Sequence, residues 1–186
     1  AAAAQAELAA RAPSMPIAVS RLSAAEAEAR LGALTEILID AIEGGASVSF
    51  LRPLGHDEAL RFWRGAIAAV GAGTRVLLLA EDETGLVGTV QLDLAWFPNQ
   101  RHRADVMKLL VHRRARRSGA GRKLMQTLES EARRAGRSLI TLDTVSGSAA
   151  ERLYLSMGYK IAGSIPRYAL SSDGRLEDTT IMYKEL

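Results

Sequence analysis

Cysteine is absent from the 186 residues of this chain, and the aromatic residues Phe, Trp and Tyr make up only 5% of it. Without cysteine the chain has no disulfide framework, no thiolate nucleophile and no thiolate metal site, which fits a reducing compartment, so we expect a cytoplasmic protein. No apolar run approaches the ~20 residues of a membrane-spanning helix, so we expect no membrane partner. The histidines, His56, His102 and His112, lack metal-ligand spacing, and we expect no metal.

The composition that remains is typical of a folded domain. Hydrophobic residues make up 48% of the chain, charged residues 24%, and the net charge is only +3. This length suits one domain with a sizeable core. We expect that domain over residues 16–186, and we interpret the alanine-rich residues 1–15 as a disordered extension or a tag remnant.

Two hydrophobic periodicities alternate along the chain. Apolar residues at helical spacing predict helices over residues 23–43, 57–71, 119–135 and 148–157. Alternating or continuous apolar runs predict strands over residues 17–21, 75–81, 86–97, 104–112, 138–145, 159–170 and 179–186. A mixed sheet with helices on both faces is the natural way to bury these elements, which indicates an α/β fold.

A basic loop lies between a predicted strand and a predicted helix, and it reads Arg116-Arg117-Ser118-Gly119-Ala120-Gly121. The unpaired N–H groups and the dipole of a helix N-terminus attract anions, and glycines let a ligand approach the backbone closely. The Walker pattern fails because its glycines do not match, and the dinucleotide pattern fails because Leu124 takes its third glycine position. The loop therefore predicts a phosphate site, with a solvated basic turn as the alternative. Nucleic acid is not expected, because no aromatic residues interleave the arginines.

The loop resembles the [RQ]-x-x-G-x-[GA] loop of the GCN5-related N-acetyltransferase (GNAT) superfamily, which binds the pyrophosphate of acetyl-CoA. Residues 149–159 resemble the A-x-x-L-Y-x-x-x-G-[FY] pattern of the same superfamily, with Tyr154 as its tyrosine. Gly147 replaces the usual asparagine, so Ser146 or Ser148 is the candidate for the pantetheine contact. The resemblance implies the GNAT fold, a mixed, mostly antiparallel central sheet of about seven strands with helices on both faces, and acetyl-CoA as cosubstrate.

Short segments further resemble the tabtoxin-resistance acetyltransferases, namely residues 44–48, 108–109, 142–144, 147–148 and 173–176. This likeness implies an amino-acid-like toxin or antibiotic as acceptor. We therefore expect an enzyme that moves acetyl from acetyl-CoA to a primary amine of a small molecule. Dimers are frequent in the superfamily, so the resemblance also offers a homodimer as the oligomeric state. A protein or peptide acetyltransferase and a non-catalytic acetyl-CoA-binding module are the alternatives.

Acetyl transfer to an amine needs a held donor, a deprotonated amine, oxyanion donors and an acid for the departing thiolate. The resemblance assigns the acid to Tyr154, for which a core aromatic is the alternative. The base is Asp105 or Asp143, each of which has a structural pairing with arginine as its alternative. Residues 105, 107 and 109 share one face of a strand.

The resemblance also implies the residues that hold the two substrates. The backbone of residues 109–111 pairs with pantetheine and donates to the oxyanion. The region after the first helix often lines the acceptor site. The candidates for acetyl-CoA are Leu109, Leu110, Val111, Arg116, Arg117, Ser118, Gly119, Ala120, Gly121, Arg122 and Ser148, and those for the acceptor are Glu43, Ser47 and Phe50.

Overall fold

The structure, a computed structural model, describes residues 16–186, so the prediction for residues 1–15 lies outside it. A seven-stranded sheet has the order β1-β2-β3-β4-β5-β7-β6, in which β4 and β5 pair in parallel and the other neighbours pair antiparallel. The predicted mixed, mostly antiparallel sheet is thereby confirmed. The strands are β1 (Ala18–Leu22), β2 (Arg75–Asp82), β3 (Gly85–Leu94), β4 (Arg103–Val111), β5 (Leu139–Val145), β6 (Lys160–Leu170) and β7 (Leu176–Glu185).

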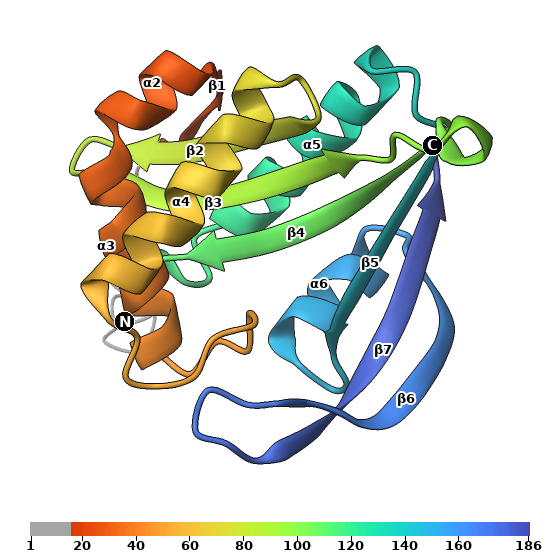
Figure 1. The fold of residues 1–186 in the computed structure, drawn as a ribbon. Coiled ribbons are helices and arrows are strands. Elements are labelled where there is room, and N and C mark those ends of the chain that lie inside the picture. Colours follow the sequence, from red (N-terminus) through yellow and green to blue (C-terminus); the bar gives the residue numbers. More distant parts are fainter. Residues whose placement is uncertain (1–15) are drawn as a thin grey trace, which may run out of the picture.

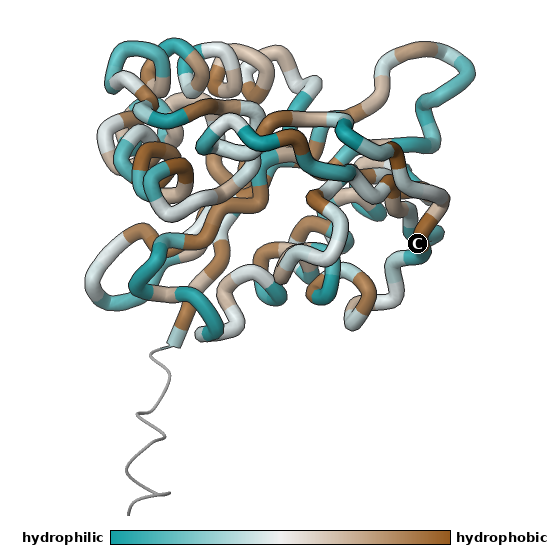
Figure 2. The backbone as a smooth tube through the Cα atoms, turned by 90° about the horizontal axis from the view of Figure 1, so that it is seen from below, coloured by the Kyte–Doolittle hydropathy of each residue, from teal (hydrophilic) through white to brown (hydrophobic). Residues whose placement is uncertain are grey.

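Helices cover both faces of the sheet, as predicted. Figure 1 shows α3 and α4 in front of β2 and β3, with α5 behind them. In Figure 2 brown and teal alternate around the helical turns, because each helix turns an apolar stripe to the sheet and a polar one to water. The helices are α2 (Ala24–Ala29), α3 (Leu31–Glu43), α4 (His56–Gly71), α5 (Ala120–Arg134) and α6 (Ala149–Ser156).

The strand β2 shows why this architecture suits the sequence. Its nearly continuous apolar run divides between two cores, because successive side chains of a strand point to opposite faces. Leu77 and Leu79 pack with fully buried Trp63 of α4, whereas Val76 and Leu78 belong to the cluster that includes residues of α5. A strand that is buried on both faces needs apolar residues at every position.

The predicted helix over residues 23–43 is two helices with a break at Arg30. The expected capping box is present, since the Glu26 N–H donates to the Ser23 hydroxyl at 3.2 Å and the Ser23 N–H donates to the Glu26 carboxylate at 2.8 Å. At Arg30 the backbone leaves the helical region, with φ −104° and ψ 7°. The break allows Ala27 and Leu34 to enter the same apolar cluster from differently directed helices.

Two strand ends differ by three residues from the sequence-based expectation. β3 ends at Leu94 instead of residue 97, and the exposed rings of Trp96 and Phe97 stack on each other with centroids 4.0 Å apart. β7 begins at Leu176 instead of residue 179, after the expected turn at Gly174, whose φ is +85°. At the end of β3 the apolar Trp96 and Phe97 resemble strand positions although both are exposed, and at the start of β7 the exposed positions carry no burial pattern that marks the boundary.

Candidate acetyl-CoA site

β4 and β5 begin as neighbours and then separate. Their parallel pairing covers only residues 103–105 opposite residues 139–141, although β4 continues to Val111 and β5 to Val145. Figure 1 shows the two strands diverging from the side of the C-terminus. Beyond residues 105 and 141, the facing edges of the two strands have no strand partner within the described residues 16–186. Such edges are the backbone template to which an extended ligand can add like a further strand.

A β-bulge lies in β4 where the strands separate. Met107 pairs with Gln91 and Leu110 pairs with Thr89, so Lys108 and Leu109 together stand opposite one residue of β3. Lys108 has φ +52°, a left-handed conformation that is uncommon for a residue other than glycine. The bulge therefore redirects the backbone at Leu109, within the segment that sequence analysis assigned to pantetheine and the oxyanion.

The loop at residues 116–121 ends at the N-terminus of α5, as its sequence predicted. Gly119 caps the helix with φ +91°, and Arg117 also has a positive φ of 65°. The first helical bond runs from the Lys123 N–H to the Gly119 carbonyl at 3.0 Å. Gly121 and Arg122 precede Lys123 in the helix, and within residues 16–186 their backbone N–H groups have no acceptor. These donors and the helix dipole make an anion site.

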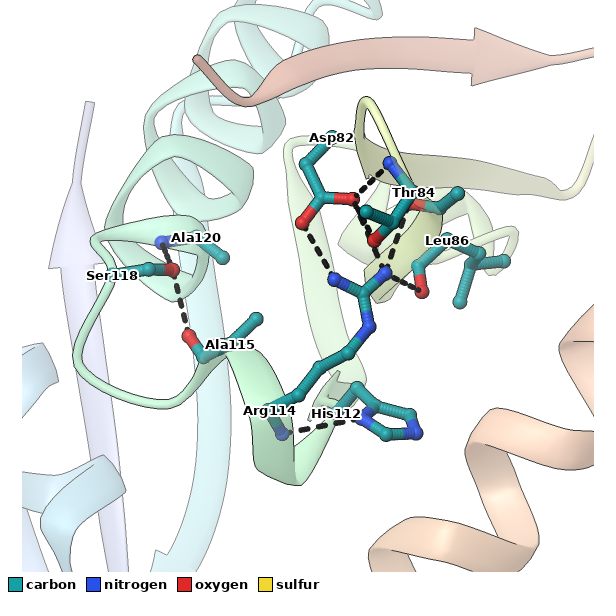
Figure 3. A network of polar contacts seen from close by, with 9 residues as sticks. Asp82, Thr84, Leu86, His112, Arg114, Ala115, Ser118 and Ala120 are labelled. Carbon is teal, nitrogen blue, oxygen red and sulfur yellow. Dashed lines mark hydrogen bonds and ion pairs between the residues drawn. The ribbon is translucent and has the colours of Figure 1, made fainter. Parts of the chain in front are cut away.

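A polar network fixes the base of this loop (Figure 3). The Arg114 guanidinium donates to both carboxylate oxygens of Asp82, at 2.6 and 3.2 Å, and also to the carbonyl of Leu86 at 3.3 Å. The bonds from Arg114 above all, and further bonds from Thr84, outweigh desolvation and hold the pKa of Asp82 well below its usual range. The Ser118 hydroxyl donates to the Ala115 carbonyl at 2.6 Å, so Ser118 shapes the loop from inside.

Arg114→Ala is expected to lower the melting temperature near neutral pH, and the difference from wild type should shrink below about pH 4. A carboxyl whose pKa is depressed in the folded state stabilises the fold above its unfolded pKa and stops doing so as it is protonated. Melting temperatures of both proteins between pH 3.5 and 7 test this. Arg64→Ala, on an exposed position of α4, is the control. A difference that stays constant over this pH range would contradict the prediction.

One cavity of about 1370 Å³ connects the loop with the opening between the strands. Most of the predicted donor-site residues line it, together with both Asp143 and Tyr154, so the structure brings together residues that are distant in sequence. Its wall includes Ser47, Leu109, Leu110, Val111, Arg116, Arg117, Gly119, Ala120, Gly121, Arg122, Asp143, Ser148 and Tyr154.

Tyr154 and Asp143 both line this cavity. Tyr154 is buried, and its ring packs 5.6 Å from that of Tyr159. Burial first, and the negative charge of Asp143 second, raise the pKa of the Tyr154 phenol above its usual value. The phenol therefore keeps its proton at neutral pH, which is the state that a proton donor needs. Asp143 is exposed to the cavity from β5.

Four predicted residues do not line the cavity, namely Ser118, whose hydroxyl bonds within the loop, and Asp105, Phe50 and Glu43. Asp105 pairs with Arg103 at 2.8 Å and accepts a hydrogen bond from the Thr141 hydroxyl, at the end of β4 where the strands are still joined. These contacts favour a structural role. Phe50 packs edge-on against Phe62 at 5.4 Å, and Glu43 ends α3. Only Ser47 of the three predicted acceptor residues lines the cavity.

Gly147, which replaces the usual asparagine, lies between two serines whose hydroxyls take part in hydrogen bonds within the protein. Ser148 caps α6 and accepts from the Glu151 N–H at 3.1 Å, while the Ser146 hydroxyl lies 2.7 Å from that of Thr180. Gly147 has φ +74°, and its N–H donates to the Glu151 carboxylate. Ser148 lines the cavity, but its hydroxyl already serves the helix.

Sequence reasoning missed two charged residues of the cavity wall, Lys108 and Glu177. Lys108 offered a signal, because it is a lone charge between Met107 and Leu109 in an otherwise apolar run. Glu177 offered none, since the strand that carries it was expected to begin only at residue 179.

Two further properties concern the described residues. No helix within residues 16–186 is both long and apolar enough to cross a membrane. The same residues hold no group of three or more His, Asp or Glu side chains arranged to bind a metal ion.

Residues 36–159 match the family model described as "Acetyltransferase (GNAT) family". The chain belongs to this acetyltransferase family. The match includes the loop at residues 116–121, the bulge of β4 and Tyr154. Acetyl-CoA is therefore the acetyl donor, and the chain is an acetyl-CoA-dependent acetyltransferase.

Solved structures share the fold of this acetyltransferase. A Salmonella typhimurium protein, YncA, solved with acetyl-CoA, has a TM-score of 0.73 and 24% identity over 92% of this chain and 94% of its own. The ribosomal-protein-alanine N-acetyltransferase of Brucella melitensis has a TM-score of 0.74 and 24% identity over 91% and 99%. An aminoglycoside 6'-acetyltransferase type Ii has a TM-score of 0.68 and 18% identity over 90% and 96%. At these identities the likeness shows the fold.

The residues of the GNAT site fit acetyl-CoA. The free N–H groups at the start of α5, with Arg116 and Arg117 beside them, suit the pyrophosphate. The unpaired edge of β4 offers backbone groups to the amides of the pantetheine arm. Tyr154 lines the same cavity as this loop and this strand edge.

Proposed function

We propose that this acetyltransferase moves the acetyl group of acetyl-CoA directly to a primary amine of a small molecule in a ternary complex. The acceptor end of the cavity, where residues 45–49 and residues 168–170 form the walls, carries this proposal. The Arg52 N–H donates to the Ser172 carbonyl at 2.7 Å, and its guanidinium lies 3.8 Å from Asp173. These contacts join the two walls, and a polypeptide acceptor needs a groove that is open there.

The charged and polar residues of the cavity receive the following roles in this proposal. Asp143 binds the ammonium of the acceptor, and the ammonium proton passes to water, because a carboxylate is a weak direct base for an ammonium. The backbone N–H of Leu109 or Leu110 stabilises the tetrahedral oxyanion. Tyr154 protonates the departing thiolate. The loop at residues 116–121, with Arg122, holds the pyrophosphate, and Ser148 borders the pantetheine.

A panel of amines tests the proposal by release of free CoA from acetyl-CoA. It includes amino acids, β-lactam analogues of amino acids, polyamines, aminoglycosides and peptides with free N-termini. Turnover with a small amine supports the proposal, and turnover of a β-lactam amino acid also supports the resemblance to tabtoxin-resistance enzymes. Turnover of peptides alone, or binding of acetyl-CoA without CoA release for any amine, would contradict it.

Asp143→Asn is expected to lower kcat/KM for the acceptor about 10-fold, because a charge-assisted hydrogen bond to the ammonium becomes a neutral one. Asp105→Asn makes the same chemical change outside the cavity and is expected to leave kcat/KM unchanged. Steady-state kinetics of both variants compare the two carboxylates directly. If Asp105→Asn lowers turnover and Asp143→Asn does not, the base has been assigned to the wrong residue.

The possible homodimer also belongs to this proposal. β6 lies at the edge of the sheet and carries exposed apolar side chains, among them Ile161, Ile165 and Tyr168. An exposed edge strand with apolar side chains favours association with a second copy. Light scattering on the purified chain decides between monomer and dimer. The cytoplasmic location stays a prediction from the absence of cysteine.

A further inference from the structure

Lys108 combines a left-handed backbone conformation with a charged side chain at the cavity wall. It stands in the bulge of β4 with a left-handed backbone, and its side chain lines the cavity. Its Nζ donates to the Ser49 hydroxyl at 2.7 Å and lies 5.9 and 6.0 Å from the ring centroids of Phe50 and Phe62. The amine is thus held inside the acceptor end of the cavity, although nothing in the proposed mechanism uses it.

Asp143, one of the catalytic residues proposed above, acts on this amine, and both residues line the cavity together with Tyr154. Asp143 acts electrostatically on the Lys108 amine and also on the Tyr154 phenol, so it lies within range of both. Burial lowers the pKa of Lys108, while the charge of Asp143 raises it again in part. The neutral, nucleophilic amine is therefore more abundant at Lys108 than at a fully solvated lysine. In the proposed function the acceptor amine binds beside Asp143, so Lys108 places a tethered amine near that position.

We propose that Lys108 is a self-acetylation site, which receives the acetyl group of bound acetyl-CoA when no acceptor amine occupies the cavity. The inference rests on the function proposed above. The neutral Nζ attacks the thioester carbonyl carbon, a C–N bond forms and the C–S bond breaks. The proton of the attacking nitrogen passes to water beside Asp143, and the thiolate takes a proton from Tyr154. The products are an amide on Lys108 and free CoA.

The modification changes the charge of the acceptor end. Lys108, Asp143 and Glu177 are the charged side chains that line the cavity away from the arginines of the loop. Acetylation removes the one positive charge among them and leaves two carboxylates. The acetylated enzyme therefore favours cationic acceptors more strongly than the unmodified enzyme does, and its lengthened side chain occupies part of the acceptor space.

The other lysines of the chain lack this environment. Lys184 is paired with Glu129 at 2.8 Å, Lys123 donates to the Ile17 carbonyl at 3.1 Å, and Lys160 is exposed on β6. None of the three lines the cavity. Chemical acetylation by free acetyl-CoA falls on exposed amines such as Lys160, whereas acetylation within the site falls on Lys108.

The test incubates the full chain with acetyl-CoA in the absence of any amine and follows the intact mass, with peptide mapping of the acetylated position. We expect one acetyl group per chain on Lys108, added at least about 10-fold faster than on Lys160, because the tethered amine reacts intramolecularly. Lys108→Arg keeps a cation near Ser49 and is expected to lose this acetylation, while Lys160→Arg keeps it. Tyr154→Phe is expected to slow it.

Equal acetylation of Lys108 and Lys160, or a rate that Lys108→Arg leaves unchanged, would overturn the inference. Circular dichroism of the variants confirms that they fold, and mapping of the wild-type chain requires no variant. CoA release with the amine panel is measured in parallel. Turnover of an amine without acetylation of Lys108 overturns this inference alone. Acetylation of Lys108 without turnover of any amine overturns the proposed function alone.

Discussion

Gly121→Leu is expected to weaken the binding of acetyl-CoA by about 100-fold or more, a loss of roughly 3 kcal/mol, measured by isothermal titration calorimetry. Gly121 lies in the first turn of α5, where the pyrophosphate is expected. A Cβ atom at this position would lie 3.3 Å from a methyl carbon of Leu153 and 3.7 Å from one of Val111. The remaining atoms of a leucine side chain must then extend into the cavity that both residues line.

Gly121→Leu is expected to lower the affinity for acetyl-CoA without lowering the stability of the fold. Leucine favours helix over glycine by about 1 kcal/mol, so α5 is expected to fold at least as well. Gly121→Ala is the matched control, because its single methyl group stays in contact with the wall and should change affinity only a few-fold. If Gly121→Leu keeps its melting temperature and binds acetyl-CoA as tightly as the wild type, the loop does not hold the donor.

Tyr154→Phe is expected to lower kcat by about 100-fold or more with little change in the affinity for acetyl-CoA. The substitution removes only the hydroxyl, so the ring still fills its place in the core and still packs against Tyr159. Because burial and the charge of Asp143 raise the pKa of the phenol, it stays protonated through the neutral range and is ready to donate. Rapid-mixing measurements of the chemical step, with titration of acetyl-CoA, test both parts.

Tyr159→Phe provides the comparison for this variant. Tyr159 lies in the same cluster, is buried as Tyr154 is, and also has a raised pKa because of burial, but it does not line the cavity. Loss of its hydroxyl is expected to leave kcat within about twofold, since proton transfer requires contact with the reacting groups. Equal losses in both variants would mean that the hydroxyls act on packing, and a wild-type rate for Tyr154→Phe would remove its role as acid.

The main elements of the fold could be predicted because their patterns reflect burial. The continuous apolar run of β2 and the helical stripe of α4 determine which side chains can leave water, whatever surrounds them. The break at Arg30 and the early start of β7 could not be predicted in this way. The break at Arg30 depends on how α2 and α3 pack. At Leu176 an exposed strand is held by backbone pairing that any sequence can make.

The donor site could be predicted from the sequence, whereas the acceptor site could not. The loop at residues 116–121 is contiguous, and local chemistry at a helix N-terminus suffices to indicate an anion. Asp105 and Asp143 looked equivalent in sequence, because both lie on strands next to the expected site. They differ in the structure, since β4 and β5 are still paired at Asp105 and have separated before Asp143.

The sequence by itself indicated the donor. The arginine- and glycine-containing loop between a strand and a helix predicts an anion site through chemistry at neighbouring atoms, and its resemblance to the GNAT loop, with Tyr154 downstream, implies acetyl-CoA. Only the tertiary structure decided what surrounds the acceptor. The divergence of two strands, the bulge at Lys108 and the contact of Arg52 with Ser172 join segments that are far apart along the chain. Such contacts depend on how whole elements pack, and local sequence carries no record of that packing.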